Sequence, residues 1–195
     1  MDEVKFKDLR LKDLKIMETQ TAVFGGGCFW CTEAIFQRLM GVTSVLPGYS
    51  GGDLPNPNYD LIKSMPTGYV EVSKVEFDPG QISFRDLLDV FFVTHDPTQV
   101  GGQGYDMGDD YRSVIFYTTQ EQKQQAEDFI SQLENDEVFN KPIVTSVEPM
   151  KNFYPAEDYH QNFYNRNSGY GYCQVIINPK LQKLKKRFAA KLKPE

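Results

Sequence analysis

The sequence predicts one globular domain of the mixed α+β or α/β class. Its 195 residues are 40% hydrophobic and 25% charged, a globular composition in a chain long enough to bury a core. Strand-like and helix-like apolar patterns both recur along the chain. We find no repeat of fixed period and no low-complexity segment. Residues 1–18 are expected to form an N-terminal arm, helical from Phe6 to Ile16, and residues 19–195 a single domain.

The first half of the chain alternates strands and helices. Three glycines end the first strand, apolar residues at helical spacing follow them, and Gly41 stands where a helix C-terminus favours glycine. Ser83, with Asp86 three residues later, indicates a capped helix start. The predicted elements are a strand at 21–24, a helix at 29–40, a strand at 42–49, a loop at 50–59, a strand at 70–77 and a helix at 84–94.

The second half opens on a long loop rich in glycine and acidic residues, and such loops are often functional. The last predicted helix is basic and amphipathic, which usually indicates a solvated helix face. An adaptor domain that binds an acidic partner through this basic tail is an alternative. The predicted elements are a loop at 96–111, a strand at 113–118, a helix at 119–135, a strand at 143–148, a short helix at 155–164, a turn-rich segment at 164–172 and a helix at 181–192.

Charge and composition exclude several functional classes. The net charge is −6, which disfavours an electrostatic grip on nucleic acid or on an anionic membrane. No run approaches the ~20 apolar residues of a membrane span, and the N-terminus has no apolar signal core. Three cysteines are too few for a disulfide scaffold, so a cytoplasmic setting is expected, where a cysteine serves reactivity or metal binding. We expect a monomer.

The strand–glycine–helix pattern places Cys28 at a helix N-terminus. Free backbone N–H groups and the helix dipole stabilise an anion there, so the pKa of the Cys28 thiol is expected to fall and the thiol to become a nucleophile. The glycines allow backbone to approach a ligand closely. Phe29 and Trp30 follow at once and offer a flat apolar wall beside the sulfur.

Other interpretations of this stretch stay open. Cys28 and Trp30 are equally well read as a buried, inert thiol and a core aromatic residue. The spacing of Cys28 and Cys31 is that of a redox-active pair. Cys28, Cys31 and Cys173, with His95 or His160, are a weaker candidate for zinc because only one cysteine pair is present. The glycine turn also suits phosphate, but neither nucleotide-binding motif is complete.

Collinear motifs then point to a family. They are Gly27–Trp30, Gly48–Gly52, Pro55–Tyr59, Thr67–Glu71, His95–Gln99, Gly104–Gly108, Tyr111–Ser113, Ala156–Gln161 and Gly171–Cys173. Together they resemble the class A peptide methionine sulfoxide reductases over roughly residues 19–178, and several motifs in order are far more specific than one. The resemblance implies an α+β two-layer sandwich around a mixed sheet with a ferredoxin-like core, and a long C-terminal coil returning over the site.

The resemblance also implies a reaction. The family reduces the S epimer of methionine sulfoxide, free or in proteins, and so repairs oxidised proteins without a cofactor. The sulfoxide oxygen is a strongly basic leaving group, so proton donation to it makes the sulfur open to attack. The attacking cysteine becomes a sulfenic acid, and a second thiol condenses with it to a disulfide. Thioredoxin is the expected reductant of that disulfide.

Residue roles follow position by position from the resemblance. Cys28 matches the nucleophile, and Glu71 matches the acid that hydrogen-bonds the sulfoxide oxygen. The other matches are Phe29 and Trp30 for the substrate methyl group, Tyr59 and Tyr111 for hydroxyls aimed at the same oxygen, and Asp106 for the polar network. From residue type alone, the solvent face of a strand is the favoured reading of Glu71, half-buried packing is the usual role of the two tyrosines, and Asp106 between glycines reads as a turn residue.

Cys173 matches a family resolving cysteine, and its glycine-rich surroundings are expected to let it swing toward Cys28. Cys31 stays open as the alternative resolving cysteine or as a core thiol. His95 and His160 are expected to be structural and receive no chemical role. Glu157 and His160 have the helical spacing of a metal-binding pair, but two ligands do not make a site. The chain departs from the common family pattern at Tyr69, Tyr105 and Asp110, all expected near the pocket, where they bear on substrate preference and pH optimum.

Overall fold

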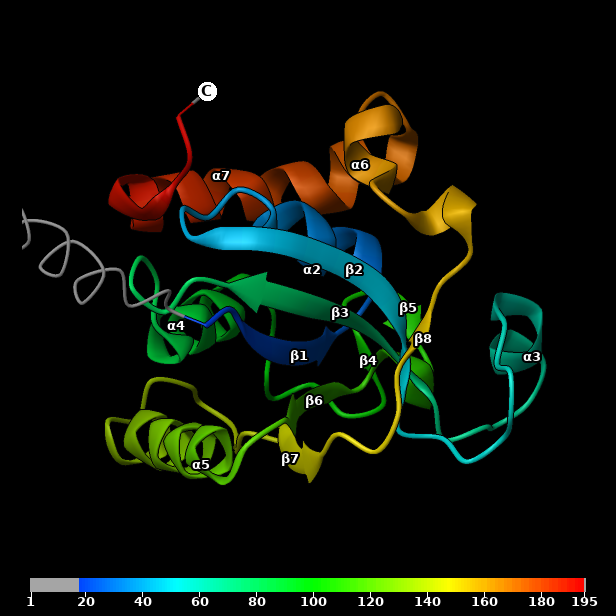
Figure 1. Ribbon diagram of the computed structural model, residues 1–195, viewed down its shortest axis with the longest axis horizontal. Helices are drawn as coiled ribbons and strands as arrows, with labels where there is room; N and C mark the ends of the chain where they lie inside the picture. The colour runs from blue at the N-terminus through cyan, green and yellow to red at the C-terminus, as the bar shows by residue number, and fades with distance from the viewer. Residues whose placement is uncertain (1–17, 195) are drawn as a thin grey trace, which may run out of the picture.

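Six strands of the computed structural model form one mixed sheet (Figure 1). The structure describes residues 18–194, so the predicted helix at 6–16 lies outside the described residues. The strand order is β7-β6-β1-β3-β2-β8, in which β6 and β7 are parallel and every other pair is antiparallel. The strands are β1 (Gln20–Gly26), β2 (Val42–Ser50), β3 (Val70–Phe77), β6 (Ser113–Tyr117), β7 (Ser146–Pro149) and β8 (Tyr154–Pro155).

The centre of the sheet has the predicted ferredoxin-like topology. Helix α2 (Phe29–Phe36) connects β1 to β2, and α4 (Phe84–Thr94) connects β3 to β6. The resulting β1-α2-β2-β3-α4-β6 unit gives the antiparallel order β6-β1-β3-β2, the split βαβ arrangement. This confirms the predicted sandwich. Ser83 caps α4 with the predicted capping box to Asp86.

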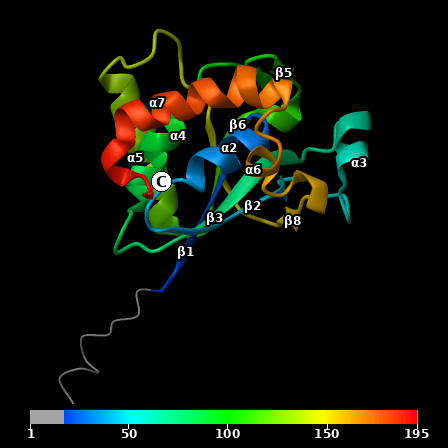
Figure 2. The ribbon, with the colours of Figure 1, turned by 90° about the horizontal axis from the view of Figure 1, so that it is seen from above.

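Further helices and short elements surround this centre. Helix α5 lies beside α4, and α7 packs against both α2 and α4 (Figure 2). These elements are α3 (Tyr59–Ser64), β4 (Gly102–Gln103), β5 (Asp106–Met107), α5 (Gln120–Asn135), α6 (Phe163–Arg166), α7 (Asn178–Phe188), 3-10 turns at Asp109–Tyr111, Asp158–His160 and Ala189–Lys191, and a π-helical turn at Cys173–Ile177. No helix within residues 18–194 is long and apolar enough to cross a membrane.

Alternation along β1 divides the apolar residues between the two faces of the sheet. Phe24 points to the helices, where its ring lies 5.0 Å from Phe36 of α2 and 5.0 Å from Phe91 of α4. Val23 points to the other face, into a smaller cluster that Met150 and Phe153 cover. The main core therefore lies between sheet and helices, and it holds α2, with Cys28 at its start, in a fixed position.

Several element boundaries differ from the sequence prediction. The helix expected at 29–40 ends at Phe36, and the loop expected at 96–111 contains the β4–β5 hairpin. The C-terminal coil runs from about residue 150 to 172 with only short elements, and the chain then turns helical at Cys173. Cys173 itself is fully buried in helical structure, and the turn that holds Gly169 ends at residue 170, shortly before it.

Gly27 makes the turn between β1 and α2 possible. Its φ is +89°, and a Cβ there meets Gln103 Cβ at 2.6 Å. We expect Gly27→Ala to lower the free energy of unfolding by at least about 2 kcal/mol, combining backbone strain and overpacking. Gly104→Ala is the matched control, because φ there is +60° with nothing within 4 Å of an added Cβ. Urea denaturation measures the free energy of unfolding of both variants. If Gly27→Ala and Gly104→Ala lose the same amount, the contact with Gln103 does not contribute as proposed.

Candidate active site

Cys28 is the N-cap residue of α2, at the point where β1 ends. Its side chain is 8% exposed and makes no capping hydrogen bond. The next residue, Phe29, donates its backbone N–H to Glu71 Oε2 at 3.2 Å. Strand β3 runs beside β1, and this pairing places Glu71 at the start of α2 although 43 residues separate it from Cys28. The two residues proposed for the chemistry therefore meet at one helix end.

The predicted lowering of the Cys28 pKa is wrong. Burial raises the pKa of Cys28 well above its usual value, and a hydrogen bond with Cys31 and the nearby Glu71 carboxylate raise it further. Only the Trp30 backbone N–H acts in the opposite direction. The same thiol–thiol hydrogen bond lowers the pKa of Cys31 to about 7 against the effect of burial. Of the two thiols, Cys31 therefore ionises first.

Glu71 is buried, with 2% of its surface exposed, so it is not the solvent face of a strand. Besides the Phe29 N–H, its carboxylate meets Lys63, whose Nζ lies 3.0 Å from Oε1. Burial raises the pKa of Glu71 to about 7, and Lys63 and the Phe29 N–H oppose that rise. A carboxyl group with such a pKa holds a proton for part of the time at neutral pH, as a general acid must.

Tyr59 and Tyr111 lie on the same side of Glu71 as Lys63. The Lys63 ammonium is 3.7 Å from the centre of the Tyr111 ring and 5.3 Å from that of Tyr59. Burial, and next the charge of Glu71, raise the pKa of Tyr111; burial also raises that of Tyr59. Both phenols therefore keep their protons and remain hydrogen-bond donors at neutral pH.

An aromatic cluster stands on the other side of Cys28. Trp30 is half-buried and stacks on Phe163 with ring centres 3.7 Å apart and 5° between the planes. Its Nε1–H donates to His160 Nδ1 at 3.1 Å, which fixes the indole in place. Phe29 is buried, with its ring 5.0 Å from that of His160 and 5.8 Å from that of Tyr49. The predicted pair of aromatic residues is thus held rigidly beside the thiol.

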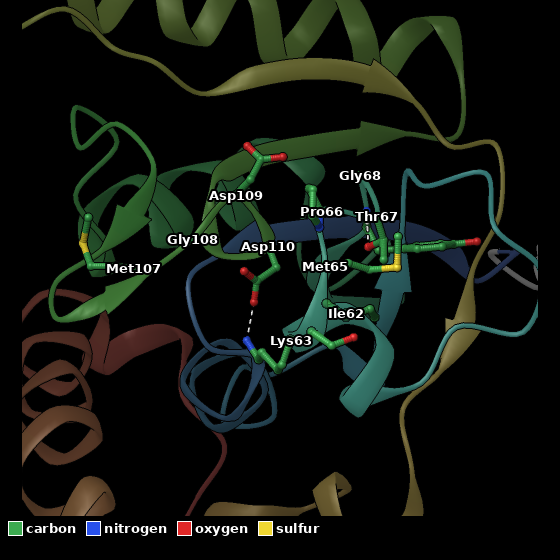
Figure 3. Close-up of a pocket in the computed structure, with 12 residues that line it drawn as sticks. Ile62, Lys63, Met65, Pro66, Thr67, Gly68, Met107, Gly108, Asp109 and Asp110 are labelled. Atoms are coloured by element: carbon green, nitrogen blue, oxygen red, sulfur yellow. Dashed lines mark hydrogen bonds and ion pairs between the residues drawn. The ribbon is translucent and has the colours of Figure 1, made fainter.

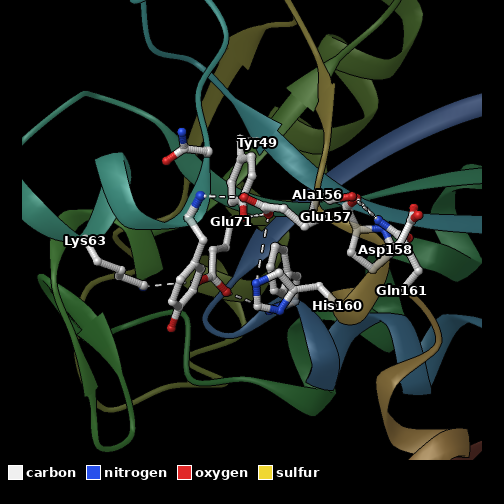
Figure 4. A network of polar contacts seen from close by, with 12 residues as sticks. Tyr49, Lys63, Glu71, Ala156, Glu157, Asp158, His160 and Gln161 are labelled. Carbon is white, nitrogen blue, oxygen red and sulfur yellow. Dashed lines mark hydrogen bonds and ion pairs between the residues drawn. The ribbon is translucent and has the colours of Figure 1, made fainter.

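His160 and Glu157 belong to a network that supports this side of the site (Figure 4). Glu157 accepts the Tyr49 hydroxyl at 2.7 Å and the Tyr59 backbone N–H at 2.8 Å. His160 Nε2 is 4.0 Å from Glu157 and, within the described part of the chain, has no hydrogen-bond partner. Glu157 therefore anchors the first residue of α3 to the coil that crosses the site.

A second polar chain runs from Asp106 to the cysteines. The Tyr172 hydroxyl donates to Asp106 Oδ2 at 2.5 Å and lies 3.8 Å from Cys31 Sγ. Cys173 is fully buried next to Tyr172, and burial raises its pKa. Asp106 is thus connected to the cysteines through the Tyr172 hydroxyl, so it is part of the polar network and more than a turn residue.

The remaining predicted residues lie apart from the thiol. His95 is buried in the core, where Nδ1 contacts Phe91 O at 2.5 Å and Nε2 contacts Ser113 Oγ at 2.7 Å. Tyr105 is 89% exposed, and the Tyr69 hydroxyl donates to Leu54 O at 2.5 Å, away from Glu71. Of the three departures from the family pattern, only Asp110 enters the site, where it pairs with Lys63.

Sequence reasoning missed Lys63, Tyr172 and Phe163. A signal was available for Lys63, which follows Tyr59 by four residues and so shares its helix face, but α3 itself was not predicted. Tyr172 and Phe163 reach the site from the C-terminal coil, and no local pattern predicts that. Within residues 18–194, no three His, Cys, Asp or Glu side chains are grouped to hold a metal ion.

Comparison with known proteins identifies the family. Residues 20–192 match the family model described as peptide methionine sulfoxide reductase. The chain belongs to the peptide methionine sulfoxide reductase family. It is therefore an enzyme that reduces methionine sulfoxide, which confirms the function expected from the collinear motifs.

Relatives of this reductase are similar over nearly their whole length. The peptide methionine sulfoxide reductase MsrA of Deinococcus radiodurans is 53% identical over 174 residues, covering 89% of this chain and 84% of the relative. That of Sulfolobus acidocaldarius is 48% identical, covering 88% and 97%. The crystal structure of reduced Mxr1 from Saccharomyces cerevisiae superimposes with a TM-score of 0.74 at 31% identity, covering 80% of this chain and 89% of that chain. These neighbours share the mixed α+β fold described above.

Proposed function

We propose that this reductase acts on the S epimer of methionine sulfoxide, free and in proteins, with Cys28 as nucleophile and Glu71 as acid. One observation carries the proposal: the Glu71 carboxyl group is hydrogen-bonded to the residue that follows Cys28. The arrangement brings a thiol and a proton-holding acid to the same end of α2, where both can act on one sulfoxide group. Repair of oxidised proteins follows as the biological role.

The proposed reaction begins with a proton transfer between the paired thiols. Cys31 ionises first, with a pKa of about 7, and its thiolate is the base nearest to the Cys28 thiol; the proton moves from Cys28 to Cys31 against their pKa difference, and attack by the Cys28 sulfur draws this transfer forward. The Cys28 thiolate attacks the sulfoxide sulfur while Glu71 gives its proton to the sulfoxide oxygen, with Tyr59 and Tyr111 as further donors. Transfer of the oxygen to Cys28 then breaks both the S–O bond and the bond between the two sulfur atoms, which leaves a sulfenic acid on Cys28 and releases methionine. Methionine gains the two electrons that Cys28 loses.

The aromatic side of the site is proposed to select the substrate. Trp30 and Phe29 form a rigid apolar surface, on which the methyl group of the sulfoxide loses contact with water. Because the oxygen is directed to Glu71 on the opposite side, only one arrangement of the groups around the chiral sulfur fits. This is the physical basis that we propose for the preference for one epimer.

For the resolving step, the geometry favours Cys31 over Cys173. Cys31 lies one turn after Cys28 at the start of α2, where its backbone N–H donates to Cys28 O at 3.0 Å, and the Tyr172 hydroxyl, held by Asp106, lies 3.8 Å from its sulfur. Cys173 is fully buried within helical structure, and the glycine-containing turn expected to carry it across ends at residue 170, before that helical structure begins. We propose that Cys31 condenses with the sulfenic acid to give the Cys28–Cys31 disulfide and water, and that Cys173 serves as a second thiol behind it.

Thioredoxin is the proposed reductant. Mxr1 from Saccharomyces cerevisiae has been solved in complex with Trx2. A dithiol partner of this kind reduces the disulfide by thiol–disulfide exchange and restores both cysteines. We also propose a monomeric, cytoplasmic enzyme in which residues 19–195 form the catalytic domain. Removal of residues 1–18 is then expected to leave the activity unchanged.

A single-turnover experiment tests the proposed function. Fully reduced protein is mixed with racemic, N-blocked methionine sulfoxide without added reductant, and methionine, the epimer consumed and the disulfide formed are measured. About one methionine per chain, from the S epimer, supports the mechanism. No methionine from folded, reduced protein would contradict it, and consumption of the R epimer would overturn the proposed orientation of the sulfoxide.

The resolving cysteine is tested by two matched variants. Cys31→Ser is expected to form methionine more slowly, because the proton acceptor is lost, and to leave Cys28 as a sulfenic acid that dimedone traps. Cys173→Ser is expected to form the Cys28–Cys31 disulfide at the rate of the unmodified protein. Peptide mass spectrometry after one turnover distinguishes them. A Cys28–Cys173 bond formed by the unmodified protein at the rate of methionine release would instead make Cys173 the first resolving thiol.

A further inference from the structure

Lys63 occupies a position in the site to which neither the motifs nor the proposed reaction gives a role. It lies on α3, four residues after Tyr59, and its side chain is 25% exposed. Its Nζ is 3.0 Å from Oε1 of Glu71, which is 2% exposed. The same ammonium pairs with the Asp110 carboxylate. A single cation therefore joins a buried acid to an acid nearer the surface.

The groups that face Glu71 come from every element packed against it. They are Cys28 and the Phe29 N–H from α2, Tyr59 and Lys63 from α3, Asp110 and Tyr111 from the 3-10 turn, and Tyr49 from β2. Among them, Lys63 is the cation and Asp110 the nearest other carboxylate. Lys63 favours the ionised form of Glu71, whereas Asp110 favours the protonated form.

These contacts create a conflict with the proposed chemistry. Glu71 must hold a proton to give it to the sulfoxide oxygen, yet a cation at 3.0 Å from a buried carboxylate stabilises the ionised form. The conflict is reduced because Asp110 shares the ammonium. The balance between the charges of Lys63 and Asp110 therefore determines the fraction of Glu71 that carries a proton.

We propose that Lys63 is a positioning residue that sets the proton occupancy of Glu71. Asp110 opposes the effect of Lys63 on Glu71, because it pairs with the same ammonium group. The inference rests on the proposed role of Glu71 as the acid. Burial disfavours the Lys63 ammonium, but Glu71 and Asp110 outweigh it and raise the pKa of Lys63, so the lysine stays charged while Glu71 titrates. Lys63 therefore acts as a fixed charge and not as the proton donor.

Lys63 is also reachable from solvent. It lines a pocket of about 400 Å³ between α3 and the 3-10 turn, together with Asp110 and Gly108 (Figure 3). A pocket of this volume can hold a small alkylammonium ion. When the lysine side chain is cut back to alanine, such an ion can occupy the vacated space, which gives a test of charge that is separate from a test of folding.

The first experiment compares pH profiles of kcat/KM for Lys63→Gln and Asp110→Asn, with Lys123→Gln as control. Lys123 is a surface residue of α5 paired with Glu127, far from the thiol in sequence and fold. The alkaline limb of the profile is the fall in kcat/KM as Glu71 loses its proton. Lys63→Gln is expected to move this limb to higher pH by about one pH unit or more, and Asp110→Asn is expected to move it to lower pH. The control should not move it. Shifts in the same direction, or none, would overturn the inference.

A second readout does not depend on activity. The Glu71 carboxyl band is followed by difference infrared titration, with Glu71→Gln providing the assignment. The titration midpoint should move up in Lys63→Gln and down in Asp110→Asn. If the midpoints move while the limbs of kcat/KM stay fixed, Lys63 does set the protonation and the proposed acid role of Glu71 fails. If neither midpoint moves, the inference fails whatever the activity.

Chemical rescue completes the test. In Lys63→Ala, added methylammonium or ethylammonium is expected to return the alkaline limb and the infrared midpoint toward their original values, and an uncharged alcohol of the same size is not. Rescue by both, or by neither, would contradict a role for charge. If Lys63→Gln does not fold, Asp110→Asn still tests the inference, because that variant keeps the contact between Lys63 and buried Glu71. Its alkaline limb and its Glu71 titration midpoint should then both move to lower pH.

Discussion

Replacing Cys28 with serine is expected to abolish methionine formation, lowering kcat/KM by at least about 10⁴-fold. A serine hydroxyl is far less acidic than a thiol and is a poor nucleophile toward sulfur, so the first bond of the reaction does not form. The substitution is small, and the surroundings hold the residue at 8% exposure, so we expect the fold to persist. Methionine yield in a single turnover and a thermal melt measure the two effects.

Two results make this prediction specific. Dimedone labelling after a single turnover should mark Cys28 in the Cys31→Ser variant and mark neither Cys31 nor Cys173 in Cys28→Ser. Residual methionine from folded Cys28→Ser above about one part in 10³ would contradict the assignment. Because three thiols lie in this region, such a result would move the nucleophile to Cys31, whose pKa of about 7 already makes it the more acidic of the pair.

Patterns that depend on neighbouring residues predicted much of the fold. The strands at β2 and β3, the capped start of α4 and helix α5 were each within about two residues of the prediction, because alternation, capping and helical spacing are local signals. Helix α3 was missed because Pro55 and Pro57 precede it and suggested only a loop. Its Asn58 cap, which accepts the Leu61 N–H, was nevertheless present in the sequence.

Properties that depend on distant residues were not predictable. The helix-dipole argument for Cys28 used only its own turn, whereas burial, Cys31 and Glu71 decide its pKa. The Asp106–Tyr172 hydrogen bond joins residues 66 positions apart. From type alone, Glu71 was a better candidate for the solvent face than for the site, because it alternates with Val70 and Val72 along the strand. β3 is a central strand, however, and Glu71 is 2% exposed. Family resemblance supplied the assignment.

Glu71→Gln is expected to lower kcat/KM at pH 6 by about 10²–10³-fold. Glutamine keeps a carbonyl oxygen for the Phe29 N–H but has no proton to give to the sulfoxide oxygen. Burial raises the pKa of Glu71 to about 7, so in the unmodified enzyme the acid is mostly protonated below pH 7 and ionised above it. The activity of the unmodified enzyme should therefore fall as pH rises through about 7, and this fall should be missing in Glu71→Gln.

The matched control is Glu76→Gln on the same strand, where the carboxylate is partly exposed and 3.9 Å from Lys74. It should keep both the rate and the alkaline limb. The affinity for methionine sulfoxide, measured separately, decides what Glu71 contributes. If that affinity is unchanged in Glu71→Gln while kcat falls, the carboxyl group acts only when the S–O bond breaks. A rise in KM with kcat unchanged would mean that Glu71 binds the sulfoxide without donating its proton, and Tyr59 or Tyr111 would then have to supply it.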